Sequence, residues 1–154
     1  FFAEALVRLA GQRFLAVMAG DGPEREAIER ILAAGGVAEQ VRILGSVPNT
    51  GMPDIYRAAD ISVLPSLMEA TSITGLESMA TALPLVGTRV GGIPDLIDEG
   101  ETGLLVPARD PGAMAQAIAR LLTDADVRKR MGRNGRAKVE RAFTWEVIAD
   151  VGGL

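Results

Sequence analysis

The sequence contains no cysteine and no histidine. Without cysteine, the chain has no disulfide framework and no thiol chemistry, a composition compatible with the cytosol, where we expect the protein to lie. Without histidine, this chain excludes every mechanism that needs an imidazole base or a histidine metal ligand. The chain also opens with two phenylalanines instead of a methionine, which predicts a fragment of a longer protein.

Aromatic residues and long apolar runs are scarce as well. Only 4% of the residues are aromatic although 48% are hydrophobic, so small aliphatic side chains must fill the interior. No apolar run approaches the ~20 residues that a helix needs to span a bilayer. The net charge of −4 gives no reason to expect nucleic acid as a partner. We therefore expect one globular domain, over residues 1–154, that is large enough to bury a core.

Short apolar runs alternate with segments of helical periodicity along the whole chain. Continuous apolar runs predict strands that are covered on both faces, and their alternation with helices predicts a doubly wound parallel sheet. The expected strands are residues 14–19, 41–44, 61–64, 85–88 and 103–106. The expected helices are residues 1–10, 24–34, 54–59, a segment ending before Pro84, residues 94–97, a helix starting at Pro111, and a last one from 123 or 124 to about 142.

The segment 65–92 organises the chain, because it holds two glutamates at the junction of a loop and a helix. Glu69 lies in the loop, and Glu77 follows after seven intervening residues, at the start of an apolar-periodic segment. The first turn of such a helix offers unpaired N–H groups and the positive end of the helix dipole, which suit a phosphate. Carboxylates are poor phosphate ligands but good acceptors for sugar hydroxyls. The segment therefore predicts a site for a diphosphate and two sugar rings.

Several motifs of this segment together resemble the retaining glycosyltransferases of the GT-B fold, the large family four type. The resemblance rests on Pro65-Ser66, the Glu69 and Glu77 pair, Leu76-Glu77-Ser78-Met79-Ala80, Pro84-Leu85-Val86 and Val90-Gly91-Gly92-Ile93-Pro94. It continues at residues 20–23, 41–45, 59–66, 100–106 and 131–145, in the order of the family. Nearly the whole chain is thus similar to the C-terminal, donor-binding half of such an enzyme, which implies a Rossmann-like doubly wound parallel sheet.

The chain departs from the family pattern in three places. Ala70 and Ala82 stand where glycine is usual. The third departure is larger, because the first strand of the family domain, with the arginine and lysine that hold the diphosphate, would lie before Phe1. In the strand order 3-2-1-4-5-6 that strand is central. We therefore expect either a truncated chain or a sheet that lacks its first strand.

The resemblance implies roles for single residues. Glu77 would accept the ribose hydroxyls of the nucleotide, and Glu69, the catalytic candidate, would stabilise charge on the donor sugar as its bond to phosphate breaks. The backbone N–H groups of Ser72, Ile73 and Thr74 would bind the phosphates and the sugar. The backbone of Val47 would meet the nucleobase.

Glu69, Glu77 and residues 72–74 also have a purely structural interpretation. Thr74 and Glu77 have the spacing of a capping box, in which the glutamate bonds back to the backbone of the N-cap residue. Glu69 would then be a solvated loop acid. Residues 72–74 would be an ordinary helix entry, with Ile73 and Leu76 in the core. The context of the motifs favours the functional interpretation.

Three further patterns have mainly structural interpretations. The glycine loop of Gly20, Asp21 and Gly22 lacks the P-loop lysine and predicts a plain strand–helix turn. The pair Asp124 and Asp126 resembles the metal-binding triplet of another glycosyltransferase class, but it lies at a helix start, where acids cap. The basic residues of segment 128–141 predict a solvated helix face, with docking to the other half of the enzyme or peripheral contact with an anionic membrane as alternatives.

The resemblance as a whole implies the donor domain of a retaining glycosyltransferase. Such an enzyme moves a sugar from a nucleotide diphosphate sugar, such as a UDP- or GDP-sugar, to an acceptor held by an N-terminal domain, with neither a metal nor another cofactor. Two alternatives remain open: a non-catalytic nucleotide-binding module of Rossmann type, and a sugar epimerase built on the GT-B plan.

Overall fold

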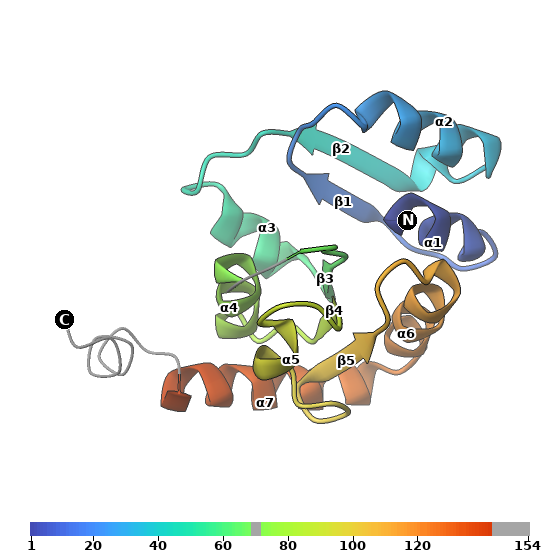
Figure 1. Ribbon diagram of the computed structural model, residues 1–154. Coiled ribbons are helices and arrows are strands. Elements are labelled where there is room, and N and C mark those ends of the chain that lie inside the picture. The colour runs from blue at the N-terminus through green and yellow to red at the C-terminus, as the bar shows by residue number, and fades with distance from the viewer. Residues whose placement is uncertain (69–71, 143–154) are drawn as a thin grey trace.

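The computed structural model describes residues 1–68 and 72–142, in which helices and strands alternate (Figure 1). The helices are α1 (Phe2–Arg8), α2 (Arg25–Ala34), α3 (Met52–Ala58), α4 (Ile73–Ala80), α5 (Ile93–Leu96), α6 (Pro111–Thr123) and α7 (Ala125–Ala142), with a 3₁₀ turn η1 (Ala38–Gln40). The strands are β1 (Ala16–Ala19), β2 (Val41–Gly45), β3 (Ser62–Leu64), β4 (Leu85–Thr88) and β5 (Gly103–Val106). All five predicted strands are confirmed, and β4 and β5 have the predicted bounds.

The strands form two separate parallel sheets. β1 pairs with β2, and β4 pairs with β3 on one side and β5 on the other. In Figure 1, β1 lies between β2 and the three-stranded sheet. Within residues 1–68 and 72–142, no strand joins β1 to β3. The arrangement is that of a doubly wound sheet with its central first strand missing.

The three-stranded sheet is covered on both faces. Every residue of β4 is buried. A cluster of residues from β3, β4, α4 and α5 covers one face, and helix α7 packs against α4. Gly103 of β5 has no room for a side chain, because a Cβ there would collide with the carbonyl oxygen of Leu85 on β4. The prediction of strands covered on both faces is confirmed in this part of the molecule.

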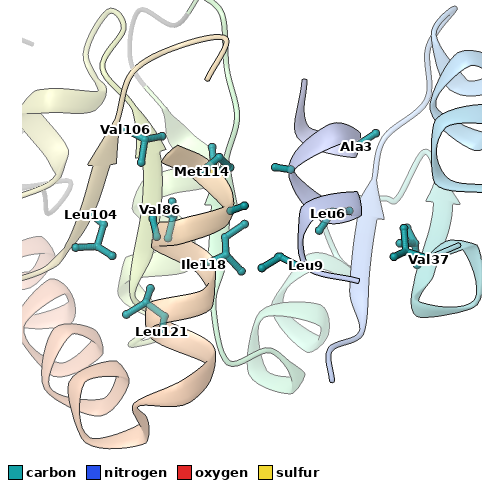
Figure 2. Packing of buried hydrophobic residues seen from close by; sticks show 14 of the residues in the cluster. Ala3, Leu6, Leu9, Val37, Val86, Leu104, Val106, Met114, Ile118 and Leu121 are labelled. Atoms are coloured by element: carbon teal, nitrogen blue, oxygen red, sulfur yellow. The ribbon is translucent and has the colours of Figure 1, made fainter. Parts of the chain in front are cut away.

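The larger core cluster lies on the opposite face and connects the two sheets. It contains Leu6 of α1, Leu9 directly after that helix, and Met114 and Ile118 of α6. These residues pack with buried residues such as Val86 of β4 (Figure 2). Partly buried side chains of β1 and β2 pack against the same cluster. The two sheets therefore share one layer of helices although they share no backbone hydrogen bonds.

The prediction that the strands are covered on both faces is wrong for the two-stranded sheet. Residues along β1 alternate between half-buried and exposed, and Val17 of β1 and Leu44 of β2 are 44% and 48% exposed. Leu15, just before β1, is 63% exposed. The outer face of this sheet has no covering layer among the described residues, since its helices pack on the other face.

Ala82, one of the positions where the resemblance expects glycine, has a backbone conformation that favours glycine. Its φ is 62°, in the left-handed region that side chains disfavour. Its carbonyl oxygen lies against Gly132 of α7, where any Cβ would collide with it. Ala82 therefore adopts the turn conformation that usually requires glycine, and its backbone is strained there.

Candidate nucleotide-sugar site

Helix α4 begins at the carboxyl edge of the three-stranded sheet, where open α/β sheets bind ligands. Its N-cap is Ser72, which is 2% exposed and whose Oγ accepts a hydrogen bond of 2.9 Å from the N–H of Gly75. The structural alternative, a capping box with Thr74 as the N-cap, is therefore wrong. A serine two residues earlier has the extended backbone and the side-chain acceptor that an N-cap requires. Glu77 lies beyond the first turn of the helix and does not cap it.

Two backbone donors in the first turn of α4 have no partner among residues 1–68 and 72–142. The N–H of Gly75 bonds to the Ser72 side chain, and the N–H of Leu76 bonds to the Ser72 carbonyl at 3.1 Å. Within the described part of the chain, no acceptor is found for the N–H groups of Ile73 and Thr74. Together with the helix dipole, these donors form the kind of position that suits a phosphate.

Glu77 is exposed, and its carboxylate is held by a tyrosine from another helix. The hydroxyl of Tyr56 in α3 donates to Oε2 of Glu77 over 3.4 Å. Burial of the tyrosine, followed by the negative charge of Glu77 and the hydrogen bond to it, raises the pKa of Tyr56. The phenol is therefore protonated at neutral pH and acts as a donor. Because Glu77 is exposed, its carboxylate is accessible from solvent, as the binding of sugar hydroxyls requires.

The alternative that placed Ile73 in the core is wrong, whereas Leu76 is half-buried and packs against the smaller core cluster. Ile73 is 67% exposed, and the residues preceding the loop, Leu67 and Met68, are 48% and 89% exposed. These apolar side chains flank the entrance to α4. The core contacts of this helix come instead from residues that include Met79, which is fully buried.

Glu69 lies outside the described residues, so its role stays a prediction. The start of its loop is fixed to the sheet, because the buried Thr88 at the end of β4 donates a hydrogen bond of 2.6 Å to the carbonyl of Ser66. This contact places the beginning of the loop at the carboxyl ends of β3 and β4, next to the start of α4.

Val47 lies in the loop between β2 and α3 and is half-buried. A Cβ on Gly51, the N-cap residue of α3, would lie 3.4 Å from Cγ1 of Val47. The N–H of Gly51 also donates to the carbonyl of Pro48 over 2.9 Å. The loop is therefore packed onto the beginning of the helix that carries Tyr56. Val47 and Glu77 come from different halves of the molecule, and α3 connects them.

The glycine loop and the aspartate pair have the predicted structural roles. The N–H of Gly20 donates to the carbonyl of Gly45 over 2.7 Å, which ties together the ends of β1 and β2. Oδ1 of Asp124 accepts from the N–H of Val127 and caps the start of α7. In residues 1–68 and 72–142 there is no group of three or more acidic residues that could hold a metal ion.

The prediction that the basic face of α7 is merely solvated is wrong for two of its residues. The guanidinium of Arg128 donates to the carbonyls of Leu121 and Leu122, at the last turn of α6. The amine of Lys138 donates to the carbonyls of Asp95 and Leu96 in α5. These cations neutralise helix C-termini. No helix in the part of the chain that the structure describes combines the length and apolar composition needed to cross a membrane.

The fold and the site define a Rossmann-like domain with a sugar- and phosphate-compatible edge, and comparison with known proteins assigns its family. The family described as glycosyl transferases group 1 matches residues 1–124. The chain belongs to this family. It is 38% identical over 143 residues to the D-inositol 3-phosphate glycosyltransferase of Corynebacterium efficiens, an alignment that covers 90% of this chain and 34% of that protein. The chain thus spans about a third of the length of this relative.

Solved structures agree with the assignment. The C-terminal domain of a glycosyl transferase group 1 family protein from Francisella tularensis is 26% identical, with a TM-score of 0.86, and the match covers 94% of this chain and 78% of that one. HepE of Anabaena, solved in complex with UDP, shares the fold with a TM-score of 0.87 at 20% identity, over 99% of this chain and 44% of that one. The fold is that of the C-terminal half of a GT-B glycosyltransferase.

Proposed function

We propose that residues 1–154 form the donor-binding domain of a retaining glycosyltransferase, which takes its sugar from a nucleotide diphosphate sugar such as a UDP- or GDP-sugar. The observation that carries the proposal is the junction at α4. There, an exposed carboxylate, Glu77, lies one turn beyond the two open N–H groups of Ile73 and Thr74. The family membership and the UDP-bound HepE of the same fold support this choice of ligand.

Each proposed contact uses a group with suitable chemistry. The N–H groups of Ile73 and Thr74 would bind the diphosphate, with Ser72 holding the helix start in place. Glu77 would accept the ribose hydroxyls through charge-assisted hydrogen bonds. The backbone at Val47 would contact the nucleobase.

Glu69 would stabilise positive charge on the sugar ring as the bond to phosphate breaks. The helix N-terminus and basic side chains would meet the phosphate charge, so the proposal includes neither a metal nor another cofactor. The acceptor would be bound by an N-terminal domain, for which the greater length of the relatives leaves room. The proposed setting is the cytoplasm.

The direct test is calorimetric titration of UDP, GDP and ADP into the 154-residue chain. We expect one of the three to bind and inorganic phosphate alone to bind much more weakly, because the site recognises ribose and base as well as phosphate. Failure of all three nucleotides to bind would contradict the proposal.

The catalytic part of the proposal needs the longer enzyme. There, Glu69→Ala should lower turnover of the donor sugar while leaving the affinity for the free nucleotide unchanged, because the proposed partner of Glu69 is the sugar. Conversion of the donor to an epimer, in place of transfer to an acceptor, would identify an epimerase. Nucleotide binding with no consumption of any nucleotide sugar would identify a binding module.

A further inference from the structure

Tyr56 is the only tyrosine in the chain, and no pattern in the sequence marks it as part of a site. It is 7% exposed in α3, yet its hydroxyl reaches the exposed carboxylate of Glu77 on α4. A buried tyrosine needs a hydrogen-bond partner for its hydroxyl, and a core tyrosine commonly finds one in the backbone. Here the partner is the side chain that we assign to the ribose.

The phenol lies between two residues of α4. It donates to Glu77, and the neighbouring side chain of Thr74 partly offsets the rise in the pKa of Tyr56. Residues three apart on a helix lie on the same side, so Thr74 and Glu77 are both within reach of a single hydroxyl. The 3.4 Å separation from Glu77 is long for such a bond, as is common in binding sites without their ligand.

The same helix also supports the nucleobase loop. The N–H of Gly51 at the start of α3 donates to the carbonyl of Pro48, next to Val47, and Tyr56 lies near the end of this helix. A glutamate side chain on the surface otherwise samples many rotamers, and fixing it on binding costs conformational entropy. A donor that restrains the carboxylate before the ligand arrives reduces that cost.

We propose that Tyr56 is a positioning residue, whose hydroxyl holds the Glu77 carboxylate in the orientation that accepts the ribose hydroxyls. Helix α3 thereby sets the distance between the ribose contact and the base loop at Val47. The inference rests on the proposed function, because it requires a ribose at Glu77. Tyr56 itself does not touch the nucleotide.

The test compares Tyr56→Phe, which removes only the hydroxyl, with Arg57→Gln as a matched control. Arg57 lies on the same helix, its side chain is 68% exposed, and it pairs with Asp54. The probes are UDP and 2′,3′-dideoxy-UDP, titrated by calorimetry into the 154-residue chain. We expect Tyr56→Phe to lower the affinity for UDP about three- to tenfold, which corresponds to the loss of one modest hydrogen bond. Dideoxy-UDP should bind this variant and the wild type about equally, and Arg57→Gln should bind both probes like the wild type.

The outcomes separate the inference from the proposed function. Suppose that the wild type binds UDP and that Glu77→Ala lowers the affinity for UDP while Tyr56→Phe does not. The inference is then wrong and the proposed function stands. Equal losses of UDP and dideoxy-UDP affinity in Tyr56→Phe would assign the tyrosine to the core alone and overturn the inference. A wild-type chain that binds no nucleotide overturns both.

A measurement without any ligand checks the contact itself. Because Tyr56 is the only tyrosine, the absorbance of tyrosinate during an alkaline titration reports on this residue alone. We expect a lower pKa for Tyr56 in Glu77→Gln than in the wild type, because the carboxylate charge raises it. An unchanged pKa would contradict the coupling.

Discussion

The two sheets of this domain have similar apolar sequences and different surroundings. In the three-stranded sheet, β4 is buried along its whole length, with helices on both faces. In the two-stranded sheet, one face contacts the shared helical layer, whereas Val17 and Leu44 on the other are 44% and 48% exposed. An apolar sequence therefore predicts that a segment forms a strand. It does not predict whether helices cover both faces of that strand.

The sheets also differ at their edges. β4 has a hydrogen-bonded neighbour on each side, while β1 and β3 each have one. Unpaired strand edges weaken a sheet and invite pairing with other chains. The candidate site depends on both sheets, since Glu77 lies on the helix that follows β3 and Val47 lies in the loop that follows β2. We expect the three-stranded sheet to be rigid, and the position of the two-stranded sheet to depend on α3 and α1.

The strongest test of this difference compares two leucines on strands. Leu85 of β4 is fully buried and Leu44 of β2 is 48% exposed. Leu85→Ala should lower the free energy of unfolding by about 2–5 kcal/mol, because it removes buried methyl groups and leaves a cavity. Leu44→Ala should cost well under half as much. Urea denaturation of both variants measures the difference, and equal losses would show that both sheets are covered in solution.

Hydrogen exchange sharpens the comparison along the backbone. We expect amides of β1 and β2 to exchange on the order of 100-fold faster than those of β4, because local opening of a sheet covered on one face is easier. The thermal melt of the chain should accordingly be broad and low. A sharp, cooperative melt of a monomer would contradict the strand order that places a gap between β1 and β3.

A smaller effect is expected at the start of α4. Ser72→Ala removes the hydroxyl that accepts from Gly75, and should lower the free energy of unfolding by about 0.5–2 kcal/mol. Thr81→Ala, at the other end of the same helix, removes a hydroxyl that donates to the carbonyl of Glu77 and provides the matched control. Thr81→Ala should lower the free energy of unfolding by less, because water can donate to the exposed Glu77 carbonyl in place of the threonine hydroxyl. Equal costs would mean that Ser72 is not the cap.

The alkaline pH dependence of stability tests the link between the halves. Burial and the charge of Glu77 raise the pKa of Tyr56 in the folded state, so folding favours the protonated phenol. This residue adds no pH dependence near neutrality, but its contribution is lost as the pH rises from the unfolded value, about 10, through the folded one. Tyr56→Phe should lack this component of the alkaline loss. Identical alkaline profiles for variant and wild type would show that the phenol is not buried against a charge.

The sequence predicts the elements well, because each strand is a short apolar run bounded by turn residues. It predicts the site less well. Both Ser72 and Thr74 are good N-cap residues, and only the backbone conformation at Ser72 decides between them. The contact of Tyr56 with Glu77 joins residues 21 positions apart, which no local pattern reports. The exposure of one face of β1 and β2 could not be predicted either, because it depends on which other elements pack on that sheet.

The central claim is that Glu77 binds ribose and does not cap its helix, and the most direct measurement is titration of UDP into Glu77→Ala with parallel thermal melts. Each charge-assisted hydrogen bond is worth about 1.5–3 kcal/mol. We therefore expect the affinity to fall by about one to two orders of magnitude, at roughly 1.4 kcal/mol per tenfold. The melting temperature should fall only by the cost of leaving the buried Tyr56 hydroxyl without its acceptor. A destabilised Glu77→Ala protein that binds UDP as tightly as the wild type would contradict the account.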